Sequence, residues 1–132
     1  MKDTVLTDAR AFPSFSVDNL DTARTFYRDT LGLHVNDRPE GLELDVGSGN
    51  KVFIYPKPDH KPATFTVLNF PVDDVEVAVD KLVTTGVRFE SYNLPQIKTD
   101  ARGIARDDDG TEIAWFKDPA GNILSVLHNR AD

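Results

Sequence analysis

The chain contains no cysteine, a single methionine and a single tryptophan among its 132 residues. Without cysteine it can form no disulfide, no thiolate nucleophile and no metal site built on Cys ligands. A chain of this length can bury a core large enough to fold by packing alone. The composition therefore favours one ordinary domain, spanning residues 1–132, in a reducing compartment.

Apolar runs long enough to span a membrane are also missing, and residues 1–8 carry charges where a secretory signal would be apolar. Basic residues are too few to balance the acidic ones, since 15 Lys and Arg stand against 22 Asp and Glu, a formal net charge of −7. A negative surface repels nucleic-acid backbones and anionic lipid. We therefore expect a cytoplasmic protein with neither nucleic acid nor a membrane as its partner.

What the chain does contain is an internal repeat. Residues 17–23 align with 72–78, and Gly32 then falls on Gly86 after a one-residue gap. A second match places 49–53 on 121–125, beginning at a shared Gly-Asn pair. The repeat predicts two tandem modules, at about 10–58 and 63–129.

Each module is predicted to hold one helix. Apolar residues recur at helical spacing from Leu20 to Leu31 and from Val75 to Val83. Asp18, and Asp73 with Glu76, are the expected N-terminal caps, and Gly32 and Gly86 the C-terminal ones.

Strands should surround these helices. In the first module we expect them at 12–17, 33–36, 42–46 and 51–55. In the second we expect them at 64–72, 87–92, 112–117 and 123–128, with 93–110 an irregular loop. The predicted fold class is α+β, built from two βαβββ modules.

Three short motifs carry a resemblance. They are Phe26-Tyr27, Leu31-Gly32-Leu33 and Asp118-Pro119-Ala120-Gly121-Asn122. In this order, on a doubled βαβββ frame, they resemble the vicinal oxygen chelate (glyoxalase/bleomycin-resistance/dioxygenase) superfamily over residues 12–128. The resemblance implies a curled mixed sheet around a cleft, formed within one chain or across a dimer.

Many members of that superfamily hold a divalent metal with His, Gln or Glu from the first and last strand of each module. The resemblance places these four positions at Phe12, Phe53, Val67 and Ser125. The first three have no lone pair to offer, and a lone serine hydroxyl is a poor ligand. We therefore expect no metal and no cofactor. The three histidines have no chelating spacing and are expected to be solvated or capping.

Strand alternation predicts the rest of the cleft. Ser14, Tyr55 and Asn69 share the face of the four positions above, and Trp115 rather than Phe116 is expected to join them. The opposite face is apolar and should pack under the helices. The predicted ligand-binding residues are Phe12, Ser14, Phe53, Tyr55, Val67, Asn69, Trp115 and Ser125.

An aromatic and apolar lining with a few neutral polar groups is typical of a small-molecule pocket. No catalytic residue is predicted, because the serines have no activating base at a recognisable position. Our leading hypothesis is a metal-free protein of the bleomycin-resistance type that binds an aromatic or amphipathic small molecule.

Two alternatives remain open. One is an enzyme of the same superfamily, a lyase, isomerase or dioxygenase, which holds a metal with non-standard ligands or uses metal-free acid–base catalysis. The other is a structural module whose cleft is filled by its own side chains. A homodimer is expected in each case, because a half-open sheet exposes edges and apolar surface.

Overall fold

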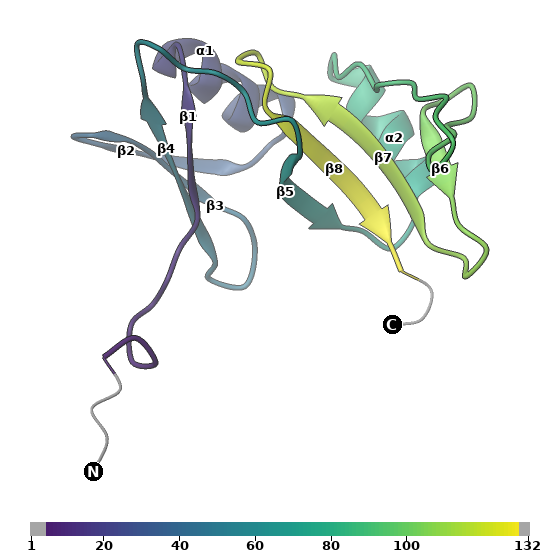
Figure 1. Ribbon diagram of the computed structural model, residues 1–132. Helices are drawn as coiled ribbons and strands as arrows, with labels where there is room; N and C mark the ends of the chain where they lie inside the picture. Colours follow the sequence, from purple (N-terminus) through teal and green to yellow (C-terminus); the bar gives the residue numbers. More distant parts are fainter. Residues whose placement is uncertain (1–4, 130–132) are drawn as a thin grey trace.

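The computed structural model describes residues 5–129, which form two four-stranded sheets, one for each repeat (Figure 1). The first sheet has the order β1-β4-β3-β2 and the second the order β5-β8-β7-β6. In each sheet the first strand in the sequence runs parallel to the last, and the other pairs are antiparallel. The predicted fold class of two βαβββ modules is confirmed, and neither sheet closes into a barrel. The strands are β1 (Ser14–Val17), β2 (His34–Arg38), β3 (Gly41–Asp45), β4 (Lys51–Pro56), β5 (Thr66–Pro71), β6 (Ile104–Arg106), β7 (Glu112–Lys117) and β8 (Ile123–His128).

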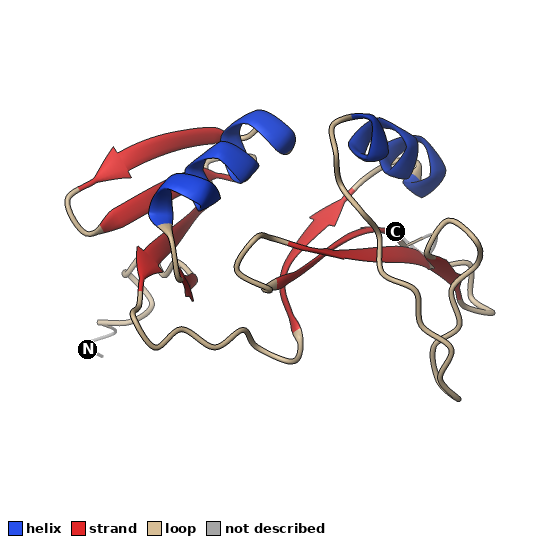
Figure 2. Ribbon diagram, turned by 90° about the horizontal axis from the view of Figure 1, so that it is seen from above, coloured by secondary structure: helices blue, strands red, loops and turns tan. Residues whose placement is uncertain are grey.

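Each module carries its helical segment on the same side of the sheets (Figure 2). The first module has α1 (Leu20–Thr25), which continues into a π-helical turn, η1 (Phe26–Thr30). The second has α2 (Val75–Thr84). As predicted, Gly32 and Gly86 follow these segments with positive φ, at +77° and +106°, a conformation that glycine adopts without strain.

The predicted N-terminal caps are wrong by one residue. The Asn19 side chain accepts the backbone N–H of Thr22 at 3.0 Å, and the Asp74 carboxylate accepts that of Val77 at 3.1 Å. The prediction placed each cap one residue too early, at Asp18 and Asp73. At both sites two residues with good capping side chains are adjacent in the sequence, and the second of them is the cap.

The core lies between the helices and the sheet faces beneath them. Val17, Leu68, Leu124 and Val126 are buried there, as strand alternation predicts. Val79 of α2 is 2% exposed and belongs to the same cluster. The opposite face of each sheet, turned away from the helices, is called the open face below.

One edge of the second sheet departs from the prediction. Residues 87–92 do not form a strand, and only Phe89 bridges to β7, opposite Phe116. The rest of that edge is β6, inside the segment predicted to be an irregular loop, where Ile104 faces Ala114. Residues 91–103 between the two pieces make backbone hydrogen bonds to one another, such as Thr99 N–H to Tyr92 O at 2.9 Å. The insertion therefore splits an edge that is one continuous strand, β2, in the first module.

A buried polar cluster joins the two modules. The Tyr27 hydroxyl donates to Asp118 Oδ2 at 2.7 Å, and Asn122 Nδ2 donates to Ser16 O at 2.9 Å. His60, which we had expected to be solvated or capping, is hydrogen-bonded to Ser16 Oγ at 2.7 Å and Ala120 O at 3.0 Å. Burial, and next the Asp118 charge, raise the pKa of Tyr27 far above its ordinary value, so its hydroxyl remains a donor. The Asp-Pro-Ala-Gly-Asn motif thus supplies hydrogen bonds that connect the two modules.

Within the described part of the chain, no helix is long and apolar enough to cross a membrane.

Candidate functional site

Strand register places five of the eight predicted site residues in two rows, one across each open face. In the first sheet Ser14 lies opposite Phe53, which lies opposite Glu43. In the second sheet Asn69 lies opposite Ser125, which lies opposite Trp115. Residues directly opposite on paired strands project to the same face. Trp115 is therefore on the open face, while Phe116 is 1% exposed in the core.

The row of the second sheet is held rigidly. Ser125 is fully buried, and its hydroxyl donates to Asn69 Oδ1 at 2.6 Å. The Trp115 indole N–H donates to Thr66 Oγ1 at 3.1 Å, and the Tyr92 ring meets the indole edge to face with 5.4 Å between centroids. The hydrogen bond and the ring contact together fix the orientation of the indole.

The row of the first sheet combines an aromatic pair with a neutralised carboxylate. Phe53 and Tyr55 are nearly parallel, 16° between planes and 6.5 Å between centroids. Beside them Glu43 Oε1 accepts hydrogen bonds from Arg38 at 2.9 Å and Asn36 at 3.3 Å. Arg38 therefore balances the charge of this carboxylate.

A bulge in β5 changes what alternation predicts. The register shifts between Thr66 and Leu68, so Val67 is the extra residue of the bulge. Thr66 is thereby placed opposite Ile123, on the open face, where it can accept the Trp115 hydrogen bond. Val67 is half-buried and packs against the core.

The single chain does not gather the predicted residues into one cavity. Phe12, which precedes β1 and is 61% exposed, lines a depression of about 940 Å³ together with Phe53. A second depression, of about 370 Å³, contains Ser14, Tyr55 and Val67. A third, of about 660 Å³, contains Trp115 beside residues 95–98. Asn69 and Ser125 line none of these three.

Sequence reasoning missed two partners of Trp115. Tyr92 was assigned to a strand that does not form, and strict alternation from Val67 would place Thr66 on the helix side. The aromatic character of Tyr92, at the start of the insertion, could have indicated a contact with another aromatic residue. The bulge that reorients Thr66 has no signal in the local pattern.

The four positions where the superfamily places metal ligands do not fit a metal here. Phe12, Phe53 and Val67 have no donor atom, and the Ser125 hydroxyl is already used. Between residues 5 and 129 no three His, Cys, Asp or Glu side chains come together in a way that could hold an ion. His128 is hydrogen-bonded to the carbonyl of Val72 at 3.0 Å, and His34 is exposed at the start of β2.

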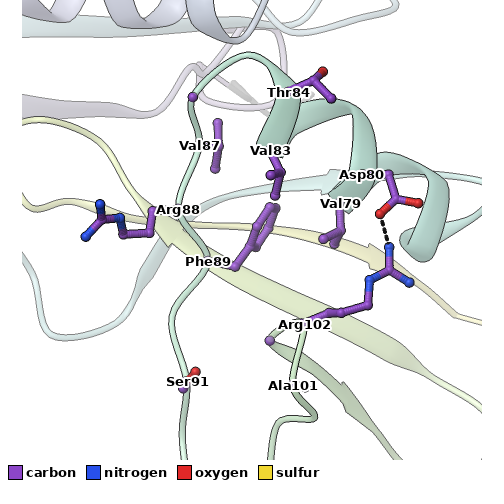
Figure 3. A pocket seen from close by; sticks show the side chains of 12 residues that line it. Val79, Asp80, Val83, Thr84, Val87, Arg88, Phe89, Ser91, Ala101 and Arg102 are labelled. Carbon is purple, nitrogen blue, oxygen red and sulfur yellow. Dashed lines mark hydrogen bonds and ion pairs between the residues drawn. The ribbon is translucent and has the colours of Figure 1, made fainter.

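A further groove, of about 730 Å³, lies between α2 and the end of the insertion, away from the open faces. Figure 3 shows Val79, Val83 and Phe89 close together in it, with Arg102 reaching Asp80 beside them. Because Arg102 is paired with Asp80 and Glu76, this cation is already satisfied. The candidate site is therefore placed on the open faces.

Comparison with known proteins agrees with this architecture. A family model described as the Glyoxalase/Bleomycin resistance protein/Dioxygenase superfamily matches residues 11–126, nearly the whole chain. The chain belongs to this superfamily. The resemblance seen in the sequence motifs is thereby confirmed, together with its implied fold. No curated protein shows significant similarity to the chain.

Several solved structures of the superfamily share the fold. A glyoxalase family protein from Enterococcus faecalis has a TM-score of 0.65 at 21% identity, covering 93% of this chain and 99% of its own. A bleomycin-binding protein complexed with bleomycin has a TM-score of 0.67 at 22% identity, covering 92% and 99%. Lactoylglutathione lyase from Agrobacterium tumefaciens has a TM-score of 0.66 at 21% identity, covering 94% and 96%. At these identities the likeness concerns the fold alone.

Proposed function

We propose that this superfamily member is a cytoplasmic, homodimeric, metal-free protein that binds a flat aromatic or amphipathic organic molecule. The observation that carries the proposal is the content of the two open-face rows. Phe53 with Tyr55, and Trp115 with Tyr92, offer aromatic surfaces. Around them stand neutral hydrogen-bonding groups such as Ser14 and Asn69. This mixture is typical of small-molecule pockets. The similar fold of a bleomycin-binding protein supports the same kind of use.

The homodimer follows from the division of the site. Phe12 and Phe65 are 61% and 67% exposed, and the predicted contact residues lie in separate depressions. Placing the open face of one chain's first sheet against a partner's second sheet would cover this apolar surface and bring Phe53 toward the partner's Trp115. Burial of apolar area contributes about 25 cal/mol per Å², which favours such pairing. Light scattering at micromolar concentration should give twice the chain mass, and a monomer would contradict the assembly.

The metal-free state follows from the four unsuitable side chains at the superfamily's ligand positions. Protein purified without chelator should contain far less than one equivalent of any transition metal after dialysis, as measured by elemental analysis. Stoichiometric zinc, nickel, iron or manganese, lost on substitution of an open-face residue such as Glu43, would instead support the metalloenzyme alternative.

Binding is tested first with bleomycin and a panel of aromatic compounds. Trp115 fluorescence and calorimetry measure the affinity of each compound. For a compound that binds, Trp115→Ala and Phe53→Ala should each weaken affinity by about 1–3 kcal/mol, the range for losing a stacked aromatic contact. Val77→Ala, on the exposed side of α2, is the matched control and should leave affinity unchanged. Unchanged affinity in both aromatic variants would refute the site. Absence of any binding compound would favour the alternative in which the cleft is filled by its own side chains.

A further inference from the structure

Another cavity lies on the helix side of the sheets, between the helical segments. It has a volume of about 270 Å³ and lies at the seam between the modules. Leu31 and Leu33 line it from the end of the first helical segment, and Leu82 of α2 and Phe116 of β7 line it from the second module. Figure 2 shows α1 and α2 standing apart on this same side of the sheets. Because Phe116 and Trp115 project to opposite faces of β7, the cavity is separate from the open-face site.

The lining of this cavity is apolar with one exception. Eight of its nine lining residues are hydrophobic, and the ninth is Lys81 of α2. Apolar surface of this kind is stabilised when a hydrocarbon removes it from water. The cavity therefore suits the body of a hydrophobic ligand.

Lys81 differs from the lysines that pair with carboxylates elsewhere in the structure. Lys51, Lys57 and Lys117 are within ion-pair distance of Asp45, Asp59 and Glu90. Among the described residues the ammonium groups of Lys61, Lys81 and Lys98 have no such partner, and of these three only Lys81 lines the cavity. The nearby acidic residues of α2, Glu76 and Asp80, are engaged by Arg102. An available cation thus stands at the rim of an apolar cavity, in a protein whose formal net charge is −7.

We infer that this cavity binds a small amphiphile with an apolar body and a single anionic group, such as a short-chain carboxylate. The hydrocarbon lies against Leu31, Leu82 and Phe116, and the carboxylate meets the Lys81 ammonium. Such a pair at the rim selects the anion, while burial of the hydrocarbon supplies the affinity.

Octanoate and octan-1-ol are matched probes for this site, because they differ only in the charged group. Methyl resonances of Leu33, Leu82 and Val126 should shift with either probe. Lys81→Met should weaken octanoate binding roughly threefold to tenfold, the range for losing a solvent-accessible or charge-assisted contact, and leave octan-1-ol unchanged. Lys81→Arg should retain octanoate binding, and Lys57→Met removes an equal charge elsewhere as the control.

Ala78→Phe tests the cavity itself, since a bulkier side chain on its α2 wall should abolish binding of both probes. Lys81 is exposed, so its variants report on the site whether or not Ala78→Phe folds. The inference is overturned if neither probe shifts those methyl groups, or if octanoate binds Lys81→Met as tightly as the parent protein. Equal affinity of a folded Ala78→Phe variant for octanoate would also overturn it.

Discussion

The two modules share a frame under the helices and differ on their open faces. The rows Phe53 with Glu43 and Ser125 with Trp115 occupy equivalent places in their sheets. Under the helices the equivalent pairs are all buried and apolar, namely Leu42 and Ala114, Leu44 and Phe116, and Ile54 and Val126. Exclusion of water restricts residue type on the helix side, whereas the open face carries no such restriction. The two open faces can therefore differ in sequence between the modules without disturbing the frame that the modules share.

The same contrast appears in the turn before each module's last strand. Val46 N–H donates to Asn50 O at 3.1 Å, and Asp118 N–H donates to Asn122 O at 2.9 Å, so both turns close alike. Asn50 is exposed, however, and Asn122 is only 2% exposed. The turn of the first module faces solvent, whereas the turn of the second module makes hydrogen bonds to the first module.

Replacing the two asparagines should separate these roles most clearly. Asn122→Ala removes the donor to Ser16 O and leaves Asp118 Oδ2 with the Tyr27 hydroxyl as its remaining side-chain donor, so we expect a loss of about 3 kcal/mol. Asn50→Ala should change stability by no more than about 0.5 kcal/mol. Urea denaturation measures both, and equal losses would show that Asn122 does not join the modules.

The glycines of these turns give a smaller difference. Gly49 and Gly121 have φ of +79° and +87°, so an alanine at either position costs about 1–2 kcal/mol in backbone strain. A Cβ at Gly121 would also lie 3.1 Å from Pro62 Cγ, whereas at Gly49 it would meet nothing within 4 Å. Gly121→Ala should therefore be the more destabilising by about 1 kcal/mol. Equal melting temperatures of the two variants would show that Pro62 yields at no cost.

The smallest effect on stability is expected at Asp100, which holds the insertion of the second module through hydrogen bonds. Burial of Asp100 acts to raise its pKa, but hydrogen bonds from Arg106 and from the backbone N–H groups of Ile104 and Arg102 outweigh it and lower the pKa to about 2. The ordinary pKa is about 3.9, so the stabilisation is present above about pH 4 and is lost as the pH falls through 2.

Because the Asp100 side chain is 36% exposed, screening limits this stabilisation to about 1 kcal/mol. Asp100→Asn should lower the unfolding free energy by this amount at pH 7 and lose its effect near pH 2. Asp45→Asn, at the Lys51 ion pair of the first sheet, is the control and should change stability less. A difference at Asp100 that persists at pH 2 would contradict the assignment to its charge.

Local patterns were sufficient for much of the fold. The helical spacing from Val75 to Val83 and the alternation in residues 123–128 each describe which face is buried, and both are properties of a short segment. The same alternation placed Trp115 opposite Ser125 in the correct phase. Alternation failed at Val67, because the bulge there depends on how β5 is aligned with β8. The strand prediction failed at residues 87–92, because a segment forms a strand only where it stays paired with a neighbouring strand.

The doubled module, the apolar faces under the helices and the lack of metal-binding side chains at the superfamily's ligand positions could be predicted without a structure, since they depend on residue type and spacing alone. Three features are visible only in the folded chain. Asn122 and His60 connect the modules, Thr66 and Tyr92 contact Trp115, and the predicted contact residues lie in separate depressions. Each of these depends on distances between residues far apart in the sequence, which are set only when the strands pair and the chain packs.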